Sequence, residues 1–146
     1  MRKILYVIMA TAFSFVASAQ SFSDDFESYS VGDLVAESSS DWTTWSNNPG
    51  SAEDAPISDA QSSQGSQSLY FSSNSANGGP QDVILPLGGH HTDGHMSILM
   101  DMYVEDDKGA YFNFQGEASI GQDWALNIFM LQTGEFFATD NNGTVA

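Results

Sequence analysis

Three carboxylates near the start of the chain are residues of the type that binds a metal ion. Asp24, Asp25 and Glu27 lie close together, and side chains two positions apart point to the same side of a strand. Ca²⁺ takes roughly six to eight oxygen ligands and favours carboxylates and carbonyls. We therefore predict a structural calcium site that includes Asp25 and Glu27. The alternative is an exposed acidic strand without an ion, because two carboxylates alone supply too few ligands.

A second group of potential metal ligands lies in the middle of the chain. One short stretch, which follows two glycines and contains a third, holds His90, His91, Asp93 and His95. Imidazole and carboxylate groups bind Zn²⁺, but this spacing matches no established zinc motif. The stretch is interpreted as a solvated loop, with a transition-metal site as the alternative.

A third set combines aromatic rings with amides and one carboxylate, the side chains that bind sugars. Rings stack against the apolar faces of sugars, while amides and carboxylates hydrogen-bond to hydroxyl groups. The strands predicted below would place six such residues on one sheet face: Asp101, Tyr103, Tyr111, Asn113, Gln115 and Asn127. We predict that this face binds carbohydrate. The alternative is that it packs against a second sheet or a loop.

Alternation of apolar and other residues predicts the strands that must position these side chains. Apolar residues occupy alternate positions along Met96–Val104, and Ala110–Gln115 has the same period of two, which is typical of half-buried strands. Between them, Glu105–Gly109 has the acidic residues of a turn and a glycine suited to positive φ. The two runs are predicted to pair as a hairpin, with Met100 and Phe112 facing the core.

A second hairpin is predicted directly after the first. Trp124–Leu131 alternates, with Ile128 on the core side, Thr133-Gly134 supplies a turn, and Glu135–Thr139 returns. Asn142-Gly143 is then a strong signal for a further hairpin, because both positions tolerate positive φ. Only three residues follow it. We therefore expect the domain to be truncated at its C-terminus, with a frayed tail as the alternative.

The first half of the chain shows a weaker pattern. Residues 37–67, rich in Ser, Gln, Asp and Gly, are predicted to be long loops around Trp42 and Trp45, of which one is expected in the core and one exposed. No convincing helix is present. Short strands are predicted at Ser21–Tyr29, Ser68–Ser73 and Asp82–Leu87. Many short strands separated by turns favour an all-β fold, an antiparallel β-sandwich or jelly roll.

Length and composition limit the classes of function. Residues 1–19 have the charged start, apolar stretch and small-residue end of a secretory signal peptide, which leaves residues 20–146 for one β-sandwich domain of a secreted protein. The apolar stretch is too short to span a membrane. The remainder has no cysteine and a single cation, Lys108, against 19 acidic residues. Binding to nucleic acid or to anionic membranes is excluded, because both need clustered Lys and Arg.

Several stretches together resemble a known superfamily. They are Asp24-Asp25-Phe26-Glu27-Ser28-Tyr29, Gly32-Asp33-Leu34, Trp42, Gly65-Ser66-Gln67-Ser68-Leu69-Tyr70-Phe71, and Asp101–Val104 with Ala110–Gln115. They resemble concanavalin A-like or carbohydrate-binding-module-like jelly rolls, in particular secreted Bacteroidetes proteins exported by a C-terminal sorting domain. The resemblance implies a location outside the cell or on the outer surface of a Gram-negative bacterium. It also implies a structural calcium ion near the opening strand.

The same superfamily includes glucanases, whose paired carboxylates lie in a motif resembling Glu-x-Asp-x-x-Glu. Retaining glycoside hydrolysis needs two carboxyl groups about 5–5.5 Å apart, and no such spacing of residues occurs in this chain. No catalytic residue is therefore predicted. We expect a non-catalytic adhesion or targeting module that binds a polysaccharide, a cell-surface glycan or another surface polymer, as part of a larger exported protein. The alternatives are a glycoside hydrolase fragment and a structural spacer without ligand.

Overall fold

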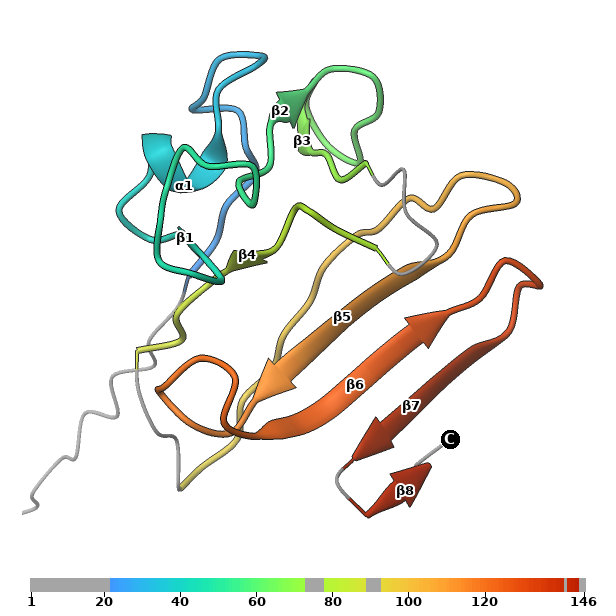
Figure 1. Ribbon diagram of the computed structural model, residues 1–146. Helices are drawn as coiled ribbons and strands as arrows, with labels where there is room; N and C mark the ends of the chain where they lie inside the picture. The colour runs from blue at the N-terminus through green and yellow to red at the C-terminus, as the bar shows by residue number, and fades with distance from the viewer. Residues whose placement is uncertain (1–21, 73–77, 89–92, 141, 145–146) are drawn as a thin grey trace, which may run out of the picture.

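The computed structural model describes residues 22–72, 78–88, 93–140 and 142–144, and in these ranges the chain is all-β with one turn of helix (Figure 1). The predicted signal peptide lies outside the described residues. The described part contains no helix of the length and hydropathy needed to cross a membrane. The elements are α1 (Val35–Ser38), β1 (Thr43–Thr44), β2 (Ile57–Ser58), β3 (Ser68–Leu69), β4 (Val83–Ile84), β5 (Ala110–Gln115), β6 (Trp124–Met130), β7 (Phe136–Asp140) and β8 (Gly143–Thr144).

The largest sheet is an antiparallel meander in the order β5-β6-β7-β8. The second predicted hairpin is confirmed: β6 pairs with β7, the Leu131 N–H donates to the Glu135 carbonyl at 2.9 Å, and Gly134 takes the positive φ of the turn. In the ladder, Ile128 lies between Phe112 and Ala138. The predicted alternation along β5 and β6 is therefore present in the sheet.

The last hairpin forms, but its turn is one residue away from the predicted position. Asp140 pairs with Gly143, so Gly143 is the first residue of β8 and not a turn position. The Asn142 N–H donates to Asp140 Oδ1 at 2.7 Å. The aspartate side chain thus closes the turn.

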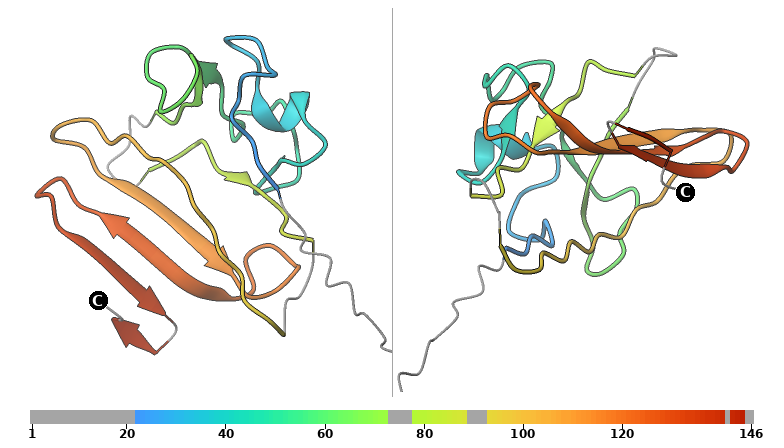
Figure 2. Two further views of the ribbon diagram at one scale, coloured as in Figure 1. Left: turned by 180° about the vertical axis from the view of Figure 1, so that it is seen from behind. Right: turned by 90° about the horizontal axis from the view of Figure 1, so that it is seen from below.

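The predicted strand Met96–Val104 is wrong, and so is its pairing with β5. The chain does turn back at Glu105, whose carbonyl accepts from the Lys108 N–H at 3.1 Å, but the positive φ falls on Asp107 and not on Gly109. Residues 95–105 carry no ladder and run in a separate layer beside the sheet (Figure 2). Alternation alone cannot form a strand, because a strand also needs a neighbour that accepts and donates its backbone hydrogen bonds.

The opening strand Ser21–Tyr29 is also wrong. Asp24 Oδ1 accepts the N–H of Phe26 at 2.9 Å, Asp25 Oδ1 accepts that of Glu27 at 3.1 Å, and Phe26 has a φ of 62°. Short carboxylate side chains that bind the backbone two residues on compete with strand pairing. The same residues that suggested a strand therefore form a turn.

The other strands of the first half are shorter than predicted. Residues 37–67 are mostly loops, as predicted, with the end of α1 and the two-residue strands β1 and β2. Ser68–Ser73 contributes only β3, which pairs with β2, and Asp82–Leu87 contributes only β4, which pairs with β1. The most deeply buried side chains lie in or beside the stretch predicted as loops: Val35, Ala36, Thr44, Asp54, Ala55 and Ile57.

The two tryptophans of this stretch are both partly buried, so neither is the exposed platform expected from the sequence. Trp42 lies in an aromatic cluster with Phe26, at a centroid distance of 6.2 Å, and its Nε1–H donates to Asp24 Oδ2 at 3.0 Å. Trp45 stacks on Trp124, at the start of β6, at 6.1 Å. Trp45 therefore joins the first half of the chain to the large sheet.

A glycine makes this junction possible. Gly121 lies in the β5–β6 connection with a φ of 78°, and a Cβ atom there would lie 2.9 Å from the Trp45 ring. Real Cβ contacts are not this short. The connection can adopt its left-handed conformation and still admit the indole because the residue has no side chain.

Candidate functional site

Three of the six residues predicted to bind sugar form one hydrogen-bonded group on the large sheet. Tyr111 and Asn113 lie on β5, and Asn127 lies opposite Asn113 on β6. Tyr111 Oη donates to Asn127 Oδ1 at 2.7 Å and accepts from Asn113 Nδ2 at 3.2 Å. Tyr111 is 50% exposed, and the two amides are partly exposed. We call these three residues the tyrosine–amide cluster.

An aromatic row crosses the same sheet face next to the cluster. The register places Tyr111 beside Phe129 and Phe129 beside Phe137 on three successive strands. Both neighbouring pairs have centroid distances of 4.9 Å, with interplanar angles of 40° and 17°. Phe129 and Phe137 were not among the predicted site residues, although the alternation along β6 places Phe129 on the face of Asn127. The pairing of Phe137 could not be read without the register.

Gln115, the fourth predicted residue, takes a local structural part. Its Oε1 accepts the N–H of Gly121 at 2.6 Å, and the register of β5 with β6 shifts between Phe114 and Gln115. The amide thus shapes the β5–β6 connection that receives Trp45. It is not joined to the tyrosine–amide cluster by a hydrogen bond within the described residues.

Asp101 and Tyr103 are separated from the cluster because residues 95–105 do not extend the sheet. Asp101 lines a groove on the opposite face, which bears Phe112 and Ile128, and its Oδ2 accepts from Ser63 Oγ at 2.5 Å. Tyr103, two residues further along this segment, is 65% exposed. The structure therefore splits the predicted binding face into two parts.

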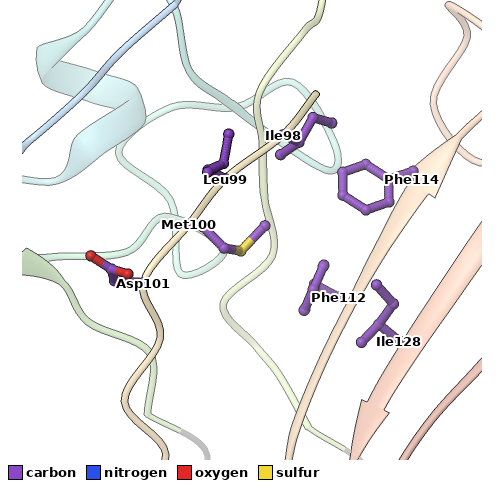
Figure 3. Close-up of a pocket in the computed structure, with 7 residues that line it drawn as sticks. All are labelled: Ile98, Leu99, Met100, Asp101, Phe112, Phe114 and Ile128. Carbon is purple, nitrogen blue, oxygen red and sulfur yellow. The ribbon is translucent and has the colours of Figure 1, made fainter. Parts of the chain in front are cut away.

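The groove lies between the sheet and the segment 95–105 and has a volume of about 340 Å³. Figure 3 shows Ile98 and Met100 directed toward Phe112, Phe114 and Ile128. The predicted core side of the segment thus faces the sheet. It is incompletely covered, since Ile98 is 43% and Met100 is 51% exposed.

The two predicted calcium ligands both bind the protein itself. Glu27 Oε1 accepts the N–H groups of Ser66 at 2.8 Å and Gln67 at 2.7 Å, and Oε2 accepts Ser66 Oγ–H at 2.9 Å. The Ser66 N–H, followed by the Ser66 hydroxyl, lowers the pKa of Glu27. Asp25 accepts the backbone N–H of Glu27. The Glu27 carboxylate therefore fastens the opening turn to a loop 39 residues further on.

Potential metal ligands do not gather elsewhere in the described part of the chain, where no group of three or more His, Asp or Glu side chains could hold an ion. His90 and His91 lie outside the described residues, and His95 is exposed. The calcium ion predicted at Asp25 and Glu27 stays a prediction.

Asp54, the carboxylate that accepts four backbone hydrogen bonds in the described part of the chain, was not indicated by the sequence. Asp54 is only 3% exposed, and its two oxygens accept four backbone N–H groups at 2.8–3.0 Å, from Ala36, Glu37, Gly50 and Ala55. Two of these donors belong to the first turn of α1, where no N-cap side chain accepts them. Asp54 therefore has a structural role, because it replaces an N-cap for donors 17 and 18 residues before it in the chain.

No family model, curated protein or solved structure matches this chain. The function must therefore be argued from the residues themselves.

Proposed function

We propose that this chain is a secreted, non-catalytic module that binds carbohydrate through the tyrosine–amide cluster. The observation that carries the proposal is the hydrogen-bonded set of Tyr111, Asn113 and Asn127 on a partly exposed sheet face. A ring beside fixed amide donors and acceptors suits a sugar, which has both apolar faces and hydroxyl groups. Since the three side chains bind one another, they lose little rotamer freedom when a ligand arrives.

We also propose that the domain is a β-sandwich of the jelly-roll type, as the resemblance to concanavalin A-like domains implies. The sheet β5–β8 would be one layer, and residues 95–105 would begin the facing layer. Support comes from Ile98 and Met100, which point toward Phe112 and Ile128 across the groove (Figure 3). Facing side chains from two layers form the core of such folds.

Secretion and a role in adhesion or substrate targeting complete the proposal. They rest on the predicted signal peptide, residues 1–19, and on the resemblance to secreted domains. Expression of the full chain in a Gram-negative host, followed by N-terminal sequencing of the exported product, tests the location. A mature N-terminus at Gln20 supports it, and an uncleaved product retained in the cytoplasm contradicts it.

Binding is tested with a polysaccharide array and three versions of the chain: wild type, Tyr111→Ala and Tyr70→Ala. Tyr70 is the matched control, since it is a tyrosine of similar exposure, 42%, that follows β3 and is not part of the large sheet. We expect Tyr111→Ala to weaken binding at least about tenfold, which corresponds to roughly 1.4 kcal/mol, and Tyr70→Ala to bind like the wild type. Equal loss in both variants, or in neither, contradicts the assignment to this site.

The two alternatives give different results in the same samples. A glycoside hydrolase fragment would release reducing ends from a bound polysaccharide, and a structural spacer would bind no member of the array. Binding without release of reducing ends supports the proposed module.

A further inference from the structure

The aromatic row has few free ring faces. Rings whose centroids are 4.9 Å apart with planes inclined by 17°, as in Phe129 and Phe137, can only be offset-stacked, because rings lying edge to edge in one plane are further apart. Phe129 also packs against Tyr111 at 4.9 Å. Phe129 therefore has an aromatic neighbour on each of the two adjoining strands.

A free ring face lies at the end of the row on the edge strand β5. β5 has β6 on one side and no strand on the other within the described sheet. Among the described residues, the one ring that packs against Tyr111 is Phe129 on β6, and Tyr111 is the residue of the row that is 50% exposed. A sugar ring therefore finds its stacking surface at the β5 edge, where the phenol hydroxyl is already held by the two amides.

The polar atoms at this position carry no formal charge. Beyond the bonds to Tyr111 Oη, the cluster offers Asn113 Oδ1 as an acceptor and Asn127 Nδ2 as a donor. The only cationic Lys or Arg in the described ranges is Lys108, in a turn whose neighbours are Glu105, Asp106 and Asp107. Within the described part of the chain, a uronate or sulfate group could pair only with this one Lys, for which three neighbouring carboxylates compete.

The negative charge of the surrounding residues also disfavours an anionic ligand. The described ranges contain all 19 acidic residues of the chain, and a field of one sign repels ligands of that sign over about a Debye length, roughly 8–10 Å at physiological salt. An anionic polysaccharide thus meets repulsion from many carboxylates, against which the described part of the chain sets a single Lys. A cationic one is attracted by the field but finds no carboxylate within the cluster.

We infer that the ligand is an uncharged polysaccharide, one sugar ring of which stacks on the outer face of Tyr111 at the β5 edge. This inference rests on the proposed function and adds the class of ligand and the position of contact. The affinity comes from ring stacking and from hydrogen bonds between uncharged groups. Binding should therefore depend little on ionic strength, because salt screens interactions between charges.

The experiment uses the full chain on an array of neutral, uronic-acid, sulfated and amino-sugar polysaccharides, at low and at high salt. We expect binding only to neutral polysaccharides, with little change in affinity between the two salt concentrations. Tyr111→Phe, which keeps the ring but removes the hydroxyl, should weaken binding several-fold, and Tyr111→Ala should abolish it. Phe136→Ala is the control, because this ring is 60% exposed and lies beside Met130 on the other sheet face.

The outcomes separate the inference from the function on which it rests. Binding to uronic-acid or sulfated polysaccharides, or binding to amino-sugar polymers that high salt removes, overturns the inference and leaves a carbohydrate-binding function standing. Binding to no class overturns both. Circular dichroism spectra of Tyr111→Ala and Tyr111→Phe that match the wild type show that lost binding is not lost folding.

Discussion

The two halves of the molecule are held together in different ways. Residues 22–88 form strands of only two residues each, yet they contain nearly all of the fully buried side chains. Residues 110–144 form a regular four-stranded sheet whose side chains are mostly partly exposed. Regular backbone pairing and deep burial therefore occur in separate regions of this chain.

Carboxylates replace the missing ladders in the first region. Asp24, Glu27 and Asp54 together accept backbone N–H groups or side-chain donors from turns, loops and the first turn of α1. Bonds to a charged acceptor are stronger than those between neutral groups. A sequence rich in acidic residues and poor in regular strands can thus still satisfy a buried backbone.

Among the substitutions that test this difference, removal of the Asp54 carboxylate is expected to have the largest effect on the free energy of unfolding. Asp54→Ala leaves four backbone donors without their acceptor, of which those of Ala36 and Ala55 are buried. An unsatisfied buried donor costs about 1–3 kcal/mol, so we expect a loss of about 2–5 kcal/mol in the free energy of unfolding, measured by urea denaturation. Asp59→Ala, an exposed aspartate nearby, should change stability by less than about 0.5 kcal/mol. Equal effects of the two substitutions would contradict a structural role for Asp54.

The junction between the regions gives the next largest effect. Trp45→Ala removes the stack on Trp124 and empties the space that Gly121 leaves open. We expect a loss of about 2 kcal/mol, combining an aromatic pair worth about 0.5–1.5 kcal/mol with lost burial. Thermal unfolding followed by near-ultraviolet and far-ultraviolet circular dichroism should then show two transitions.

Trp42→Phe is the comparison for this variant. It removes the bond from the indole N–H to Asp24 but leaves the junction intact, so it should lower stability within a single transition. A single transition in Trp45→Ala would show that the two regions remain coupled through other contacts.

The sequence predicted the second region much better than the first. The alternation of apolar residues predicted which side chains of β5 and β6 share a sheet face. The predicted turn at Thr133-Gly134 is also present. The tyrosine–amide cluster was predictable for the same reason, because Tyr111, Asn113 and Asn127 lie at alternate positions of two adjacent strands. Periodicity is informative where strands are long enough to show it.

The rest depended on contacts that periodicity does not encode. Met96–Val104 alternates as well as β5 does, but no strand in the described part pairs with it. Asp101 and Tyr103 left the predicted face for this reason. Asp54 had no signal at all, since its donors are spread over residues 36 to 55. Long-range partners of a single polar side chain cannot be read from one sequence.

A pH titration distinguishes the carboxylates of the first region from one another. The Ser66 N–H lowers the folded-state pKa of Glu27 below its ordinary value of 4.5, so its stabilisation is present above pH 4.5 and is lost as the pH falls through the lowered pKa. Glu27→Gln should therefore lower the melting temperature at pH 7, and the difference from the wild type should disappear in more acidic solution.

Glu53→Gln provides a matched variant, because the Ser46 hydroxyl, followed by the Ser46 N–H, lowers the pKa of Glu53 in the same direction. Glu53 closes a loop of seven residues, whereas Glu27 bridges 39. We expect the smaller decrease in melting temperature for Glu53→Gln. A loop of seven residues loses less conformational entropy on closing than a loop of 39, so it depends less on the carboxylate that closes it. A melting temperature difference for Glu27→Gln that persists below the lowered pKa would contradict a contribution from its charge.

Chelation is expected to give the smallest effect. If calcium binds at Asp25 and Glu27, EDTA lowers the melting temperature of the wild type, because an ion that binds only the folded state adds stability. The decrease should be small, since Glu27 keeps its bonds to Ser66 and Gln67 without the ion. The double variant Asp25→Asn, Glu27→Gln should not respond to EDTA. An unchanged melting temperature in the wild type would count against calcium. The opening turn would then be joined to the Ser66–Gln67 loop by the Glu27 bonds and by the bonds from Gln67 Nε2 to the Phe26 and Tyr29 carbonyls.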